Sequence, residues 1–134
     1  MKLGVALCVL GLAVAIEGLS EEQKKRLEEY SKECLEVSKV EEAVLKEAEK
    51  GVFLDDPKLK VHALCFSKKI HMQNEKGEIQ VDVIKEKLTS QIKSAEEVEK
   101  VVKLCLVQKD TPENTAFEGL QCLQKNVPKD VVLF

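Results

Sequence analysis

The residues best suited to covalent or metal chemistry in this chain are five cysteines and two histidines. Cys8 lies in an apolar leader, which leaves Cys34, Cys65, Cys105 and Cys122 in the rest of the chain. An even number of cysteines in a small secreted chain is typical of disulfides that support a limited core. The sequence alone permits any of three pairings among the four.

The histidines and acidic residues form no recognisable metal or catalytic pattern. His62 and Cys65 share a helical turn, but we expect the cysteine to be in a disulfide, and there is no C-x-x-C or H-x-x-x-H pair. Phosphate-binding loops and serine nucleophile elbows are also absent from the sequence. We therefore predict no enzyme, no metal and no cofactor. Since histidine titrates at about pH 6.5, His62 and His71 are candidate pH-sensitive switches, or else surface residues without a role.

The N-terminal segment predicts a secretory signal peptide. An apolar run over residues 3–16 follows one basic residue and is shorter than the roughly 20 residues that cross a bilayer. Small residues allow cleavage after Ala15 or after Gly18, so residues 1–18 are assigned to the leader, with a buried N-terminal helix as the alternative. The mature protein would then be one secreted, extracellular domain over residues 19–134.

Composition restricts the possible partners. Charged residues make up 34% of the chain, with both signs mixed and a net charge of −3. Nucleic-acid binding needs a basic face that replaces the counterions of phosphates, so it is not expected, and neither is membrane anchoring. Apolar residues make up 44% but aromatic residues only 4%, and there is no tryptophan. We therefore predict an aliphatic core.

Start and stop signals divide the mature part into six short helices, which makes the fold class all-α. Capping residues or a cap followed by proline mark five starts, at Ser20, Ser38, Asp56, Ser94 and Thr111. A further helix is predicted over residues 81–92. The helix that starts at Asp56 is predicted to continue to about Met72. Gly51 is predicted to end the helix that starts at Ser38, and residues 126–128 are predicted to end the final helix.

Apolar residues recur at helical spacing on one face of each segment. The predicted inward residues include Leu27, Tyr30 and Cys34; Val40, Ala43, Val44 and Ala48; Ile84, Leu88 and Ile92; Val98, Val101, Val102 and Cys105; Ala116, Phe117, Leu120 and Leu123. Six short helices bury a thin core. Each disulfide would add about 3–4 kcal/mol in the chain-entropy view of cross-links.

The cysteine spacing, the helical pattern and the leader together resemble the insect odorant-binding (pheromone-binding) protein family. Its members usually carry six cysteines, and the four here take the first, third, fourth and sixth places in chain order. The second and fifth places then fall at Val61 and Glu113. Because the family pairs those two cysteines with each other, their joint loss resembles its four-cysteine branch. Local context at residues 55–60 and 110–117 supports this alignment.

The resemblance implies bridges Cys34–Cys65 and Cys105–Cys122, and six helices around an apolar cavity. It also implies a secreted carrier of a small hydrophobic ligand, such as an odorant, a pheromone or a lipid-like metabolite. The candidate ligand-binding residues, each of which could instead be ordinary core, are Leu27, Ala63, Phe66, Ser67, Ile70, Met72, Ile84, Leu88, Val102, Phe117, Leu120, Leu123 and Phe134.

Two details and one rival function complete these expectations. Ser67 lies where family members can offer a hydroxyl to a ligand's oxygen; the alternative is a bond back to its own helix. Residues 131–134 are expected to fold back as one wall, and a frayed end is the alternative. The rival function is a secreted helical interaction protein with a filled core, which would act through its surface like a cytokine or a venom component.

Overall fold

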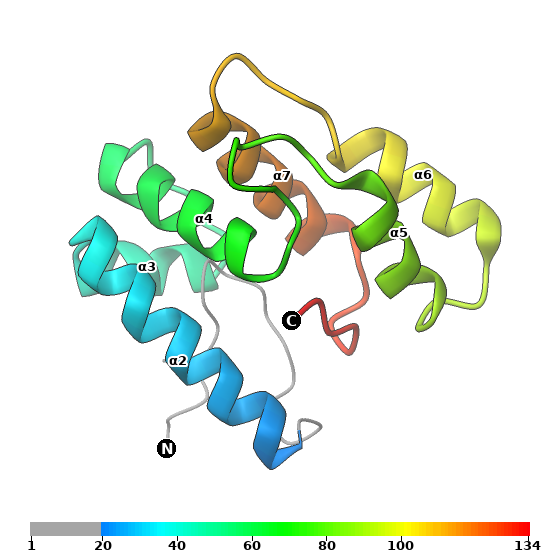
Figure 1. Ribbon diagram of the computed structural model, residues 1–134, viewed down its shortest axis with the longest axis horizontal. Helices are drawn as coiled ribbons and strands as arrows, with labels where there is room; N and C mark the ends of the chain where they lie inside the picture. The colour runs from blue at the N-terminus through cyan, green and yellow to red at the C-terminus, as the bar shows by residue number, and fades with distance from the viewer. Residues whose placement is uncertain (1–19) are drawn as a thin grey trace.

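The structure is a computed structural model that describes residues 20–134. The predicted signal peptide and Cys8 lie outside the described residues. Within them the chain forms six helices and no strand, which confirms the predicted all-α class (Figure 1). The helices are α2 (Glu21–Ser38), α3 (Glu42–Glu49), α4 (Pro57–Lys69), α5 (Val81–Thr89), α6 (Ala95–Cys105) and α7 (Pro112–Asn126). None of these helices is long and apolar enough to cross a membrane.

Most predicted helix starts are confirmed by their caps. At α2 the Ser20 hydroxyl accepts the Gln23 N–H at 3.1 Å, and the Gln23 side chain accepts the Ser20 N–H at 2.9 Å. The side chains of Asp56, Ser94 and Thr111 cap α4, α6 and α7 in the same way, by accepting backbone N–H groups of the first turn. These caps satisfy donors that have no partner inside the helix.

The predicted capping box at Ser38 is wrong. Ser38 is the last residue of α2, and α3 begins after Glu41, whose side chain makes no cap bond. The buried Ser38 hydroxyl instead accepts the Val40 N–H at 3.2 Å and lies 3.2 Å from His62 Nδ1. A partner on α4, distant in sequence, thus overrides the local pattern. The prediction that Gly51 closes α3 holds, because Gly51 follows the C-cap with φ +96°.

Two helices end earlier than predicted. α4 ends at Lys69 and not near Met72, because His71 turns left-handed with φ +65° and the Met72 N–H bonds back to the Ser67 carbonyl at 2.9 Å. This Schellman-type ending directs Met72 into the core. α5 ends at Thr89, although Ile92 remains buried in the turn that follows.

α4 lies at the centre of the packing. It contacts α2 on one side and α7 on the other, while α6 packs against α7 and α5 against α6. Cys34–Cys65 joins α2 to α4 and Cys105–Cys122 joins α6 to α7, with Cα–Cα distances of 5.6 and 5.3 Å. The pairing that the resemblance implied is therefore confirmed, and each bridge links two helices that already pack.

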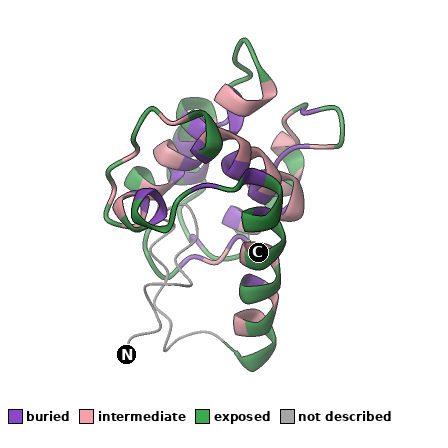
Figure 2. Ribbon diagram, turned by 90° about the vertical axis from the view of Figure 1, so that its left-hand side faces the viewer, coloured by how far each residue is buried: buried purple, intermediate pink, exposed green. Residues whose placement is uncertain are grey.

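The inward faces of the helices meet in one aliphatic core. Figure 2 shows buried residues on the facing sides of the helices and exposed residues on their outer sides. One correction concerns α3, where Ala43 is exposed and Leu45 is buried beside Val44 and Ala48. The eight-residue helix is rotated so that Leu45 is buried in place of Ala43. Burying leucine contributes more free energy than burying alanine, because more apolar surface leaves water.

Candidate ligand-binding interior

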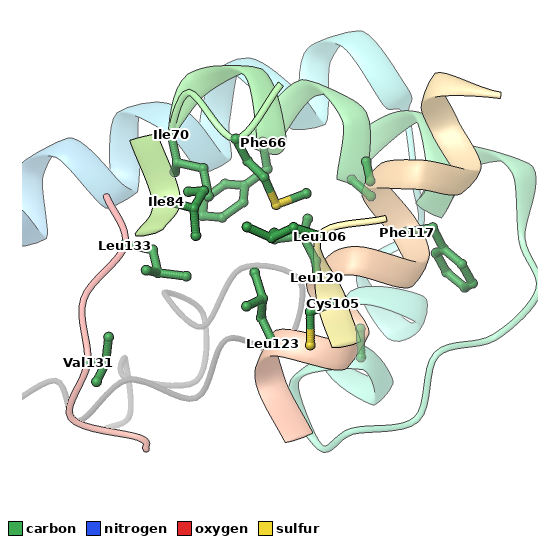
Figure 3. Packing of buried hydrophobic residues seen from close by; sticks show 14 of the residues in the cluster. Phe66, Ile70, Ile84, Cys105, Leu106, Phe117, Leu120, Leu123, Val131 and Leu133 are labelled. Carbon is green, nitrogen blue, oxygen red and sulfur yellow. The ribbon is translucent and has the colours of Figure 1, made fainter. Parts of the chain in front are cut away.

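The residues predicted to bind a ligand are almost all brought into one interior. Eleven of the thirteen are buried, and the other two, Val102 and Phe134, are half-buried and pack against the same cluster. Figure 3 shows Phe66, Ile70, Ile84, Leu120, Leu123 and Leu133 gathered toward one another, while the ring of Phe117 points away from them on the other side of α7. Phe117 packs instead against Phe53, with ring centroids 5.7 Å apart.

Helical spacing explains why these side chains converge. Ala63 and Phe66 of α4 and its C-cap residue Ile70 lie at i, i+3 and i+7, and each is at most 1% exposed. Leu120 and Leu123 follow the same rule on α7 and are fully buried. Since α4 packs directly on α7, the two stripes face each other. The interior is therefore lined by branched aliphatic side chains with few aromatic rings, as composition predicted.

The C-terminal segment packs onto this interior, as predicted. Val131 and Leu133 are buried, with 7% and 3% of their surfaces exposed. The Gln91 amide holds the segment in place, since it donates to the Val132 carbonyl at 2.7 Å and accepts the Val132 N–H at 2.8 Å. The Gln91 side chain thus bonds both backbone groups of Val132, as a residue of a neighbouring β-strand would. Sequence reasoning missed Gln91 because it lies after the end of α5 and is itself exposed.

Ser67 has a different partner from either of the two considered. Its hydroxyl donates to Gln73 Oε1 at 2.6 Å, and Gln73 Nε2 donates to the carbonyls of Gly77 and Pro112 at 2.9 and 3.1 Å. Both Ser67 and Gln73 are at most 1% exposed. The pair therefore joins α4 to the following turn and to the start of α7. A glutamine in a polar turn sequence gives no signal of this role.

His62 is a buried residue and not a surface one. Its Nδ1 faces the Ser38 hydroxyl, while Nε2 has no hydrogen-bond partner among residues 20–134. Burial lowers the pKa of His62 to about 4, although the nearby backbone of Cys34 opposes the shift. A switch at His62 near pH 6.5 is therefore wrong, because the ring is neutral there. His71 is exposed at the left-handed turn after α4.

Two further polar sites at the interior were not foreseen. Lys87 of α5 is half-buried, and its Nζ donates to the carbonyls of Ile70 and Leu133, each at 2.8 Å. On the other side, Glu49 Oε1 and Gln124 Oε1 are buried without partners among the described residues. Burial raises the pKa of Glu49 to about 7, against the opposing charge of Lys46. Such residues usually face water on amphipathic helices, so nothing in the sequence pattern indicated their burial.

Six helices, two bridges and an aliphatic interior define a small, disulfide-bonded, all-helical protein. A family model described as the PBP/GOBP family matches residues 17–126, so the chain belongs to that family. Residues 20–134 contain no group of three or more potential metal ligands.

Individual relatives agree with this membership. The B2 protein of Tenebrio molitor is 47% identical over 117 residues, which are 87% of this chain and 91% of that protein. The solved structure of the THP12 carrier protein from the yellow meal worm is similar with a TM-score of 0.58 and 35% identity, covering 73% of this chain and 91% of that one. The solved structure of the fatty acid binding protein OBP56a from the oral disk of the blowfly Phormia regina is similar with a TM-score of 0.63 and 26% sequence identity. The match covers 81% of this chain and 94% of that one.

Proposed function

We propose that this protein is a secreted carrier that holds a small apolar or amphipathic molecule in its interior and catalyses no reaction. The observation that carries the proposal is the convergence of buried aliphatic side chains from α4, α5, α7 and the C-terminal segment. Family membership supports it, since one structural relative is named a carrier and another a fatty acid binding protein.

The physical basis of binding would be burial of apolar surface. Each Å² of apolar ligand surface removed from water contributes roughly 25 cal/mol. This term has no direction, so an interior of leucine and isoleucine side chains tolerates ligands of different shape, while a polar contact selects among head groups. The proposed contact residues are the thirteen predicted from sequence, with the stripes of α4 and α7 as the centre of the site.

We further propose that the chain belongs to the four-cysteine branch of the family and that it is secreted from the cell. In residues 20–134 every cysteine is paired, which is what a branch without the second and fifth cysteines would show. Stable disulfides of this kind belong to oxidising compartments. Secretion would follow from cleavage after Ala15 or Gly18, and the N-terminal mass of the secreted protein would test it. Chemosensory fluid and haemolymph or reproductive fluid both fit such a carrier.

A displacement assay tests the proposed function. The mature chain, residues 19–134, is titrated with N-phenyl-1-naphthylamine, a probe that fluoresces in apolar surroundings. We expect saturable binding with one probe per protein and release of the probe by apolar competitors. A secreted interaction protein with a filled core would give no saturable signal, and that outcome would overturn the proposal.

A further inference from the structure

Lys87 is a half-buried cation whose partners are neutral. Its Nζ donates to the Ile70 carbonyl, at the end of α4, and to the Leu133 carbonyl, in the C-terminal segment. A lysine ammonium carries three N–H donors, so one remains for another acceptor. None of the ion pairs among residues 20–134 includes Lys87.

A second cation lies near enough to affect it. Burial lowers the pKa of Lys87, and the positive charge of Arg26 on α2 lowers it further. Arg26 itself is partly exposed and contacts Glu22 at 3.4 Å. Withdrawing an ammonium from water without a counter-ion is costly, and a nearby like charge adds to the cost. An incoming anion would remove both penalties.

Both cations adjoin the apolar interior. Ile84 and Leu88 lie on either side of Lys87 in α5 and are fully buried, and Leu27, next to Arg26, is 2% exposed. The two residues that offer their carbonyls to Lys87 also contribute side chains to the cluster, as Figure 3 shows for Ile70, Ile84 and Leu133. An alkyl chain in the interior could therefore end at Lys87.

We propose that Lys87, assisted by Arg26, binds the carboxylate of an amphipathic ligand whose alkyl chain lies in the interior. The inference rests on the proposed carrier function and names its ligand class, a fatty-acid-like anion. The alternative is that Lys87 only anchors the C-terminal segment. A neutral side chain with two N–H donors could bond the two carbonyls equally well, so anchoring does not explain why a positive charge without a counter-ion lies there.

The test compares an acid with its alcohol. Decanoic acid and 1-decanol are measured at neutral pH by displacement of N-phenyl-1-naphthylamine from wild type, Lys87→Met and Lys87→Arg. Loss of a charge-assisted bond is expected to weaken decanoate binding to Lys87→Met by about tenfold or more, with decanol changed less than about twofold. Lys87→Arg is expected to keep the preference for the acid. Equal losses for both ligands in Lys87→Met would overturn the inference.

Two further variants keep the result decisive. Lys85→Met is the matched control, because Lys85 is on the same helix but pairs with Glu99 of α6; a selective loss of acid binding there would point to overall charge and contradict a site at Lys87. If Lys87→Met fails to fold, Arg26→Gln leaves the two carbonyl bonds intact and is expected to weaken decanoate alone, by about twofold to fivefold. No selective loss in Arg26→Gln would then overturn the inference. A wild type that binds no probe would instead refute the carrier function itself.

Discussion

Buried polar side chains connect α4 to its neighbours by hydrogen bonds at the edges of the apolar interior. His62 joins α4 to the end of α2 through Ser38, and Ser67 joins it to Gln73 and so to the start of α7. A buried hydrogen bond matters chiefly because losing one partner leaves the other without water. These residues are therefore where single substitutions have the clearest effects.

Ser67→Ala is expected to destabilise the fold by about 1–3 kcal/mol, because it leaves Gln73 Oε1 buried without its donor. Urea unfolding measures this, with the exposed Thr89→Ala as a control that should change stability by less than about 0.5 kcal/mol. Since the hydroxyl hydrogen is already donated to Gln73, we expect affinities for an alcohol ligand and a matched hydrocarbon to change equally. A loss confined to the alcohol would support the ligand-binding role predicted from sequence.

His62 is expected to make the protein sensitive to acid. Its pKa is about 4 in the folded chain and about 6.5 when exposed, so the folded state binds fewer protons. The stabilisation that it contributes is complete above pH 6.5 and is lost as the pH falls toward 4, by about 3 kcal/mol in all. Urea unfolding between these pH values should show a smaller acid loss in His62→Gln than in wild type. The exposed His71→Gln should follow wild type, and an unchanged slope in His62→Gln would contradict the assignment.

At the scale of helices, four of the five starts predicted from capping residues are confirmed, whereas the predicted ends of α4 and α5 are wrong. Ser20, Asp56, Ser94 and Thr111 cap their helices through bonds to the next few residues, so the local sequence contains the whole interaction. At the end of α4, by contrast, the Ile70 carbonyl is bonded by Lys87, 17 residues away in the sequence. For the same reason spacing predicted the burial of eleven of the thirteen candidate residues, whereas it did not predict the buried polar residues beside them.

Glu49 of α3 is expected to make the protein less stable as the pH rises. Burial raises the pKa of Glu49 to about 7, so the folded state binds protons more tightly than the unfolded state. Its contribution is fully present below about pH 4.5 and is lost as the pH rises through 7. Because Glu49 is partly exposed, solvent limits the effect to about 1 kcal/mol. Glu49→Gln should therefore raise stability at pH 8 relative to wild type but not at pH 4.5.

Glu47→Gln is the control for this change, since Glu47 is on the same helix and pairs with Lys50. Thermal unfolding at the two pH values distinguishes the variants. The assignment fails if Glu47→Gln and Glu49→Gln respond alike, because the effect would then reflect the charge of the whole helix.

At the scale of the molecule, two bridges and one interior account for a stable chain with few aromatic side chains. The bridges tie α2 to α4 and α6 to α7, α4 packs on α7 and α5 packs on α6, so covalent and packing contacts together connect five of the six helices. The sixth, α3, is bonded to α7, where Gln124 Nε2 donates to the Ala48 carbonyl at 3.4 Å. The two helices without a bridge, α3 and α5, carry the partly buried Glu49 and Lys87.

The resemblance in cysteine spacing to the family's usual six-cysteine pattern predicts that α4 and α7 approach each other at Val61 and Glu113, both of which are half-buried. The double change Val61→Cys with Glu113→Cys should form an intramolecular bridge, which requires Cα atoms within about 7 Å. Stabilisation of about 2–4 kcal/mol is then expected in urea unfolding without reductant, whereas each single change should give little. A double variant that stays reduced, or that cross-links between molecules, would show that the spacing is coincidental.

The most direct test of the account is to locate a bound ligand by NMR. With methyl-labelled protein and unlabelled decanol, nuclear Overhauser effects report which methyl groups lie within about 5 Å of the alkyl chain, a distance at which apolar groups are in or near contact. We predict effects to Ile84, Leu88, Leu120 and Leu123, all fully buried. Effects only to the exposed Leu35, Val37 and Leu104, or none at all, would contradict an internal binding site.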